Sequence, residues 1–404
     1  MSINIYSYMY LTETQIINKS KELDDFTFKC KNLYNRANYI LRNEFINNGK
    51  YIQKFDMFSL LIDDPDYKSL PTRVSRSVLR ILDGNWRGFF SAIKDWKTSP
   101  GKYLGKPNLP KYLPKNGRFN AIFIDTGILK PKNGTFGLSG LKTRFKSKVE
   151  FSKIKEVNIK PLPSGKFKIN IIYKYEEKVK LKDNDKYCSI DLGLNNLMTL
   201  TSNSGLNPTL VNGRPLKSIN QYYNKKLAKL KSELPKGIRT SLRIKKLTEK
   251  RNNKINDYIH KSSRFLVNYC VDNQLNTIVL GYNEGWKTGV EMGKRNNQNF
   301  VGIPFETIKW YINYKSYMEG INFITQEESY TSKCSSLDFE QIKRHDNYLG
   351  KRIKRGLFKS GEGKLINSDV NGSLNILRKA VSNVEFTNGI EAVAVLPKKI
   401  KSFK

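Results

Sequence analysis

The apolar positions of this chain recur with two different periods. Residues 2–10 alternate between two sides, which predicts a strand, and Thr12 opens a helical stretch. Two later segments repeat apolar residues at spacings of three and four, typical of one helix face. These residues are Phe26, Cys30, Leu33, Tyr34, Ala37, Ile40 and Leu41, and then Val74, Val78, Ile81, Leu82, Trp86, Phe89 and Phe90. The pattern predicts one helical module over residues 13–97.

Short β-type runs follow this helical module, with turn residues between them. The runs cover residues 120–124, 149–151, 157–160 and 167–175. They predict a small β-barrel. The strand before the helices could belong to it, which would make the helical module an insertion. A loop at 102–117 interleaves lysine with tyrosine, which suits phosphate contacts and base stacking.

The segment 187–200 begins a region in which strands and helices alternate. It is an apolar strand that carries one carboxylate, Asp191. Burying a carboxylate is costly unless a partner compensates it, and in nucleases a metal ion often does. Glu284 ends a second apolar strand, and Asp369 stands at the start of a helix. This order suits an RNase H-like sheet, in which the first acid lies on the central strand and the others converge on it.

Three converging carboxylates repel one another, so a cation is needed to keep them ionised. Such a set can hold two Mg²⁺ ions about 4 Å apart, one activating water and the other stabilising the leaving 3′ oxygen. We therefore predict a catalytic and metal-binding set of Asp191, Glu284 and Asp369 with two Mg²⁺ ions, for which Mn²⁺ can substitute.

The net charge of the chain limits the classes of partner that it is expected to bind. Lysine and arginine number 72 against 36 acidic residues, a net charge of +36. Self-repulsion of this size disfavours the folded state unless a polyanion is bound. A compositional bias of the proteome toward lysine would raise the number of acidic residues as well, so it does not explain the twofold excess of basic residues. An anionic membrane is the main competing partner, but no amphipathic, bilayer-spanning or signal segment stands out. We predict a cytoplasmic protein that binds nucleic acid and no membrane.

The helical region 217–270, broken near Pro235, carries much of this charge. Only Glu233 and Glu249 oppose the basic residues of 217–254, whereas a solvated helix face normally mixes both signs. The one-sided charge favours a phosphate track that includes Lys245, Lys246 and Arg251.

Four motifs resemble the RuvC motifs of the TnpB family. They are Ser189-Ile-Asp-Leu-Gly-Leu-Asn-Asn-Leu197, Val279-Leu-Gly-Tyr-Asn-Glu284, Tyr330-Thr-Ser-Lys-Cys-Ser335 and Asp369-Val-Asn-Gly-Ser-Leu-Asn-Ile376. Leu70-Pro71 and Gly105–Tyr112 also resemble parts of the family's recognition helices and wedge barrel. Members of this family are transposon-encoded, RNA-guided DNA endonucleases, ancestral to type V CRISPR effectors.

The resemblance implies an α+β multidomain protein, a wedge β-barrel with an inserted helical recognition module followed by an RNase H-like (RuvC) α/β nuclease domain. The implied parts are the wedge at 1–12 and 98–182, the recognition module at 13–97, the nuclease domain at 183–385 with a target-strand-loading insertion at 328–366, and a basic, mobile tail at 386–404.

The resemblance also implies partners. A guide RNA from the transposon end would pair with one strand of double-stranded DNA beside a short T-rich motif, and a monomer would carry one RNA. When bound to DNA the protein would be nucleoid-associated. Candidate nucleic-acid contacts are Arg73, Arg76, Arg80 and Asn120 in the first half and Lys333, Lys351, Lys354, Arg352 and Arg355 in the insertion. For the first four, a solvated helix face and an ordinary strand residue are the alternatives.

The chain departs from the family at the zinc knuckle between the second and third acids. The family has four cysteines there, and this chain has only Cys334. Zinc needs about four ligands, and Cys334 with His345 supplies at most two. We predict no structural zinc.

Three alternatives remain open. A nuclease-inactive, RNA-guided DNA-binding repressor would have lost active-site acids, and all three are present. A transposase with its own acidic triad would act without guide RNA. A miniature CRISPR effector of the same fold would differ only in its genomic neighbourhood.

Overall fold

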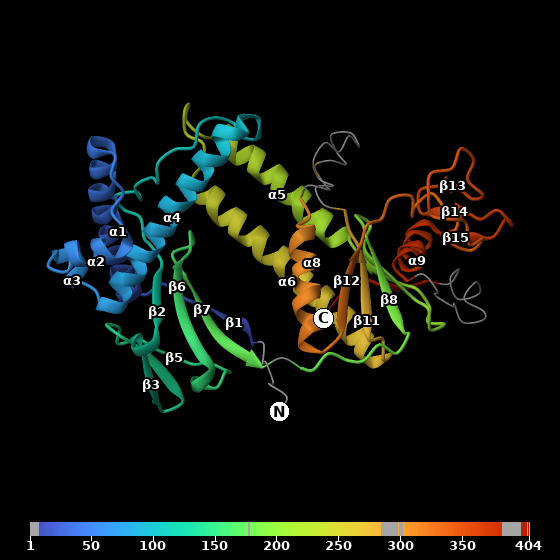
Figure 1. Cartoon of the computed structure of the whole chain (residues 1–404), viewed down its shortest axis with the longest axis horizontal. Coiled ribbons are helices and arrows are strands. Elements are labelled where there is room, and N and C mark those ends of the chain that lie inside the picture. The colour runs from blue at the N-terminus through green and yellow to red at the C-terminus, as the bar shows by residue number, and fades with distance from the viewer. Residues whose placement is uncertain are drawn as a thin grey trace. The chain divides into compact units, whose positions relative to one another are not determined.

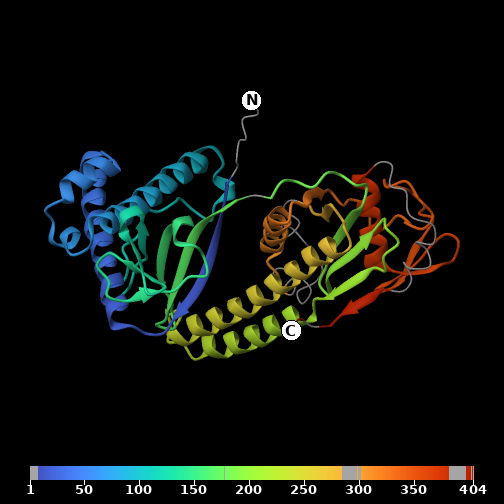
Figure 2. The same ribbon diagram turned by 90° about the horizontal axis from the view of Figure 1, so that it is seen from below.

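The computed structural model describes residues 8–176, 178–283, 298, 302–381, 397–401 and 403. The chain divides into two compact units, Met1–Glu176 and Glu177–Lys404. The ribbons of both units are drawn in Figures 1 and 2. No described helix combines the length and the apolar character needed to cross a bilayer.

The first unit contains a four-stranded antiparallel sheet of order β1-β7-β6-β2. Its strands are β1 (Tyr8–Ile17), β2 (Ala121–Ile124), β6 (Ile154–Pro161) and β7 (Phe167–Glu176). A separate three-stranded sheet consists of β3 (Ile128–Lys132), β4 (Thr135–Leu138) and β5 (Arg144–Phe145). Three short 3₁₀ turns cover Pro100–Lys102, Asp125–Gly127 and Phe151–Lys153.

Strand β1 corrects one expectation, because Thr12 does not open a helix. The strand continues to Ile17 and pairs with β7 along its whole length, from Tyr8 opposite Glu176 to Ile17 opposite Phe167. From Met9 to Ile17 its residues alternate between half-buried and exposed. This period of two is the pattern of a strand with one face on a core.

Four helices complete the first unit. They are α1 (Lys21–Asn48), α2 (Lys54–Leu61), α3 (Pro65–Lys68) and α4 (Thr72–Thr98). The Ser20 side chain caps α1 by accepting a hydrogen bond from the backbone of Leu23, and Gly49 ends the helix at a φ of 65°. The predicted apolar faces of α1 and α4 meet, and Trp86 Nε1 donates to Asn38 Oδ1 at 3.0 Å within this core.

The second unit is built on a six-stranded sheet of order β12-β11-β8-β9-β10-β16. Its strands are β8 (Tyr187–Leu192), β9 (Asn196–Ser202), β10 (Thr209–Asn212), β11 (Thr277–Gly281), β12 (Asn322–Gln326) and β16 (Lys398–Ile400). Strands β8, β11 and β12 are parallel to one another, and β9 runs antiparallel to both of its neighbours. Asp191 therefore lies on a central strand, as predicted.

Helices cover both faces of this sheet. The helices are α5 (Arg214–Ser232), α6 (Leu242–Asp272), α8 (Phe305–Met318) and α9 (Ser368–Ala380). The predicted break near Pro235 separates α5 from α6. In Figure 2, orange α8 and red α9 lie on opposite sides of the green strands. Alternation along β8 explains this, because Cys188 and Ile190 share a core with α6 and α8, whereas Tyr187 packs against α9.

The segment after β12 forms a small antiparallel sheet of β13 (Lys351–Lys354), β14 (Leu357–Lys359) and β15 (Leu365–Asn367). Within the basic C-terminal tail, which we predicted to be mobile, Lys398–Ile400 forms β16 and pairs in parallel with β10. The unpaired edge of β10 supplies the backbone partners that this short segment needs.

Candidate active site

Asp191 lies near the carboxyl end of β8, on the face of the sheet that α9 covers. The side chain is half-buried. The helix approaches it through Gly372, where an added Cβ would lie 3.0 Å from Asp191 Oδ2. A larger residue at 372 would therefore crowd the carboxylate. The glycine allows the backbone of α9 to come close to Asp191.

Another of the three predicted acids, Asp369, stands in the first turn of α9. The Asn367 side chain caps this helix by accepting hydrogen bonds from the backbone of Asp369 and Val370, at 2.9 and 3.3 Å. A helix N-terminus favours a negative charge. Asn196 Nδ2, from β9, donates to Asp369 Oδ2 at 2.8 Å. This carboxylate is therefore oriented by the Asn367 cap, by the dipole of α9 and by the hydrogen bond from Asn196.

A buried hydroxyl cluster fixes α9 to the sheet. Ser189 on β8, Thr201 on β9 and Ser373 on α9 have side-chain oxygens 2.7 to 3.2 Å apart. Ser373 Oγ also lies 3.2 Å from the backbone oxygen of Ser189 and 3.1 Å from that of Thr199. Because these residues are almost fully buried, their mutual hydrogen bonds set the register of α9, and hence the position of Asp369 beside Asp191.

Replacing Ser373 with Val should lower the free energy of unfolding by about 1–3 kcal/mol, because it leaves buried polar groups without a partner. Chemical denaturation of the full chain measures this. Ser218→Val is the matched control, an exposed serine on α5, and should cost less than about 0.7 kcal/mol through helix propensity alone. Equal losses in the two variants would contradict the role of the hydroxyl cluster.

The carboxylates are in an unfavourable electrostatic environment without a cation. Burial raises the pKa of Asp191 well above its ordinary value, and the charges of Asp369 and Glu328 raise it further, while Arg352 acts in the opposite direction. Carboxylate oxygens are the ligands that Mg²⁺ prefers. A divalent cation would remove the repulsion, so the donors fit it chemically. Among the described residues, however, no three acidic, histidine or cysteine side chains already converge as a ligand set.

The remaining predicted acid, Glu284, lies outside the described residues. A different carboxylate, Glu328, lies close enough to raise the pKa of Asp191. Burial, followed by the charge of Glu327, raises the pKa of Glu328 to about 7. The sequence contained a signal for it, since Glu328 follows the end of β12 closely, as Glu284 follows the end of β11. Only the sheet order reveals that this strand is a neighbour of β11.

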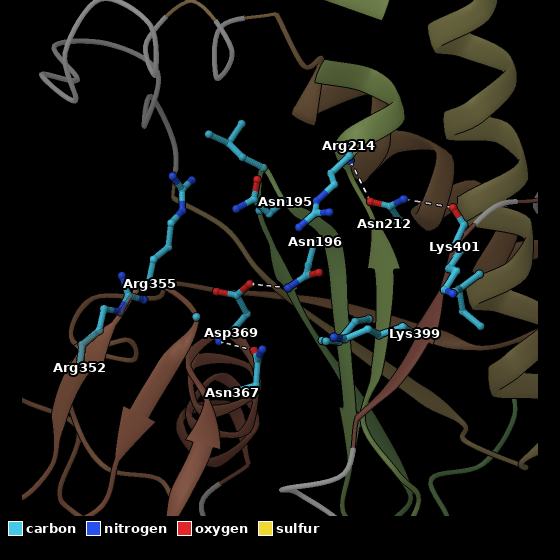
Figure 3. Close-up of a pocket in the computed structure, with 15 residues that line it drawn as sticks. Asn195, Asn196, Asn212, Arg214, Arg352, Arg355, Asn367, Asp369, Lys399 and Lys401 are labelled. Carbon is cyan, nitrogen blue, oxygen red and sulfur yellow. Dashed lines mark hydrogen bonds between the residues drawn. The ribbon is translucent and has the colours of Figure 1, made fainter. Parts of the chain in front are cut away.

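A basic pocket of about 870 Å³ opens beside Asp369 (Figure 3). Its cationic side chains come from three separate segments of the second unit. They are Arg214 on α5, Arg352 and Arg355 in the small sheet, and Lys399 and Lys401 near the C-terminus. Asn195, Asn196 and Asn212 add polar groups to its wall. Arginine and lysine around a cavity suit phosphate oxygens, so a phosphodiester bound here would lie next to the carboxylate of Asp369.

Sequence reasoning found part of this pocket. Arg352 and Arg355 were predicted contacts, whereas Arg214, Lys399 and Lys401 were missed because they lie far apart in the sequence. Lys351 and Lys354 lie exposed on β13, and Lys333 lies exposed near the ring of Tyr348.

The remaining predicted contacts fall in two places. Arg73, Arg76 and Arg80 lie exposed on α4, and partly buried Asn120 precedes β2 in the same unit. Lys245 and Lys246 lie exposed on α6. Arg251 is different, because its guanidinium donates to the side chains of Asn220 and Asn252 and to the backbone oxygen of Gly302. These bonds connect α6 with α5 and with the start of the 302–381 segment.

The residues around Cys334 do not fit a zinc site. Cys334 Sγ is buried and lies 3.5 and 3.6 Å from the backbone oxygens of Gln341 and Lys343, to which it donates. His345 Nε2 lies 2.7 Å from the backbone oxygen of Gln341. The other cysteines are buried elsewhere, Cys30 in the first unit and Cys188 and Cys270 in the core of the large sheet.

Carboxylates and amides connect the turns of this segment. Glu340 accepts hydrogen bonds from the backbone of Ser335 at 2.7 Å and of Leu349 at 2.9 Å. Asn371 and Asn375 on α9 both donate to the backbone oxygen of Cys334, at 2.9 and 2.7 Å. These hydrogen bonds attach the segment to the helix that carries Asp369, and Leu337 shares a buried apolar cluster with Val370 and Leu374 of that helix.

A zinc-selective chelator should therefore leave the melting temperature and the cleavage rate unchanged.

Glu340→Gln should instead lower the free energy of unfolding by about 1–3 kcal/mol, because an amide cannot accept both backbone donors equally well. Exposed Glu362→Gln is the control and should have little effect. Loss of activity that only zinc restores would contradict the absence of a zinc site.

Two segments of the chain match models of known protein families. A family model named OrfB_IS605, a probable transposase, matches residues 170–287, and one for the Cas12f1-like TNB domain matches residues 305–376. The structure of a Cas12f1–sgRNA–target DNA complex is similar at a TM-score of 0.55 and 16% identity, over 87% of this chain and 81% of that one. At this identity the likeness shows a shared fold.

Two further structures are similar at lower scores. A CRISPR-Cas12f ternary complex has a TM-score of 0.37 and 15% identity, over 87% of this chain and 80% of that one. The mini-RNA-guided endonuclease CRISPR-Cas_phi3 has a TM-score of 0.47 and 9% identity, over 93% and 92%. No curated protein matches the chain.

The chain shares the mixed α/β fold of the Cas12f1 structure, and two of its segments match the OrfB_IS605 and Cas12f1-like TNB models. The two matched segments confirm the resemblance to the TnpB family that the motifs indicate.

Proposed function

We propose that this protein is a transposon-encoded, RNA-guided DNA endonuclease that cuts double-stranded DNA beside a short T-rich motif. The observation that carries the proposal is the meeting of Asp191 and Asp369 on one sheet face next to a basic pocket. The strand order, with β8 central and β9 antiparallel, is the one expected of an RNase H-like (RuvC) nuclease domain. The fold shared with the Cas12f1 complex supports the same reading.

In this proposal the residues of the second unit bind and orient one phosphodiester. The cations of the pocket, Arg214, Arg352 and Arg355 among them, hold its anionic oxygens. Asp191 and Asp369 would hold the Mg²⁺ ions, which when bound supply a nucleophilic water and stabilise charge on the leaving 3′ oxygen. Asn196 and the Ser189–Thr201–Ser373 cluster keep the two carboxylates in place.

The proposed partners are a guide RNA and a double-stranded target. The net charge of +36 requires a polyanion of this kind, and the similar Cas12f1 structure is a complex with sgRNA and target DNA. The wedge would cover 1–12 and 98–182 and the recognition module 13–97. In these two parts Arg73, Arg76, Arg80 and Asn120 are candidate contacts to the adjacent motif or backbone. The nuclease domain would cover 183–385, with 328–366 loading the target strand.

Sequencing the RNA that copurifies with the protein tests this function. We expect one RNA species whose 3′ end carries the guide. Replacing that segment should redirect cleavage to a DNA of matching sequence in Mg²⁺ buffer. Cleavage that proceeds without RNA would instead indicate a transposase, and targeted binding without cleavage by the wild-type chain would indicate a repressor.

A further inference from the structure

We propose that Glu328 is a metal-binding carboxylate of the same centre, acting with Asp191 and Asp369. This inference rests on the proposed nuclease function and adds a catalytic residue to it. It assigns the third acidic position to the end of β12 and not to the end of β11, where Glu284 follows.

The register of the sheet places Glu328 on the correct face. Ser189 pairs with Val279 and Val279 with Ile324, so these three residues point to the same side of the three parallel strands. Two residues further on, the next row on that side is Asp191, Gly281 and Gln326, of which Gly281 and Gln326 are paired. This side faces α9, because Val279 packs against Ile376 and Leu377 of that helix.

Gly281 opens the path between Glu328 and Asp191. It occupies the strand that separates them, and a Cβ built on it would lie 2.8 Å from Glu328 Oε2 and 2.4 Å from Ile376 Cδ1. The Glu328 carboxylate therefore extends back over β11, into the space that a side chain at 281 would fill. Gly372 opens the same site from the side of α9, 3.0 Å from Asp191 Oδ2. Two glycines thus clear the space around Asp191 on the β11 side and on the helix side.

Asn283 holds the start of the Glu328 segment. Its Oδ1 accepts from the backbone of Glu328 at 3.1 Å, and its Nδ2 lies 3.5 Å from Glu328 Oε1. The strand ends of β11 and β12 are also joined by the backbone hydrogen bond from Tyr282 to Gln326, at 2.9 Å. The carboxylate is thereby directed toward the site by its own neighbours.

The charges around the two adjacent glutamates differ. Glu327 is more exposed and forms a salt bridge with Lys379 at 2.6 Å, whereas between described residues no salt bridge forms to half-buried Glu328. A half-buried carboxylate that faces another carboxylate is costly unless a cation joins them. A divalent cation with oxygen ligands is the group that would satisfy Asp191, Asp369 and Glu328 together.

The test compares Glu328→Gln with the matched control Glu327→Gln, in the full chain bound to one guide RNA. We expect Glu328→Gln to reduce cleavage more than about 100-fold, beyond the usual loss from an outer-shell change. The variant should also bind Mn²⁺ more weakly than the wild type when both carry the same RNA. Electron paramagnetic resonance measures this difference. Targeted DNA binding should be retained. Glu327→Gln should change neither cleavage nor Mn²⁺ binding.

Two further variants separate this inference from the proposed function. If Asp191→Ala is inactive while Glu328→Gln cleaves and binds Mn²⁺ like wild type, the inference is wrong and the nuclease function stands. Loss of cleavage in Glu284→Gln together with full activity in Glu328→Gln would return the third position to Glu284. Full activity in Asp191→Ala would overturn the assignment of Asp191 to the site, and a wild-type chain without RNA-guided cleavage would overturn the function itself.

Discussion

Asp191→Ala is expected to abolish RNA-guided DNA cleavage, with a loss of more than about 1,000-fold, because it removes the carboxylate around which the proposed metal centre is arranged. Affinity for guide RNA and target DNA should stay within about twofold, since the cations of the pocket are untouched. Single-turnover cleavage and binding assays on one preparation measure both quantities. Surviving cleavage would contradict the assignment of Asp191.

The stability of this variant provides a check on its folding. The pKa of Asp191 is raised in the folded chain, so the unfolded chain holds the ionised form more readily, and the carboxylate lowers stability at neutral pH. In metal-free buffer Asp191→Ala should therefore melt no lower than the wild type. Asp272→Ala, an exposed acid at the end of α6, is the matched control and should cleave normally. A lower melting temperature for Asp191→Ala would mean that fold, and not chemistry, was lost.

Nucleic-acid affinity is expected to fall steeply with salt. If six to ten phosphates are neutralised, the affinity should drop by about 10³ to 10⁵ between 50 and 200 mM salt. Fluorescence anisotropy with labelled target DNA and with guide RNA, repeated over this range, measures the slope. An affinity that does not change with salt would contradict the phosphate contacts proposed for the basic pocket and helices.

Pocket variants resolve the contribution of single cations. Arg352→Ala should reduce the steepness of the logarithmic salt dependence for target DNA by about one. Arg352→Lys keeps the charge and should leave the slope near that of the wild type, while losing the bidentate geometry of the guanidinium. An Arg352→Ala slope equal to that of the wild type would place this residue outside the phosphate contacts.

The local elements were largely predictable from the sequence because their periods are distinct. The apolar spacing of α1 and α4 and the break at Pro235 depend on neighbouring residues only, and the structure confirms them. Strand β1 was misjudged at Thr12, because a polar run of Thr, Glu and Gln is compatible with a helix until its pairing with β7 is known. The pairing partner lies about 160 residues away along the chain, beyond the reach of any local pattern.

The residues of the candidate site divide in the same way, into those that local sequence predicts and those that only the tertiary structure brings together. The sequence predicts Asp191 and Asp369 as site residues for local reasons. A carboxylate on an apolar strand is unusual, and a carboxylate in the first turn of a helix is favoured. Glu328 was missed although it follows a strand in the same way as Glu284. Its importance depends on which strands are neighbours, and on a glycine in the strand between. Arg214, Lys399 and Lys401 were missed for the same reason, since they meet only across the pocket.

The sequence by itself determined the net charge, the periods of the main helices and strands, and the two acids whose local settings are unusual. These are properties of single residues and of neighbours within a few positions. The tertiary structure alone decided that β8 lies between β11 and β9, that Gly281 and Gly372 open the space around Asp191, and that Glu328 extends into it. The physical reason is that strand pairing and helix packing join distant segments, and no local period records which of them will meet.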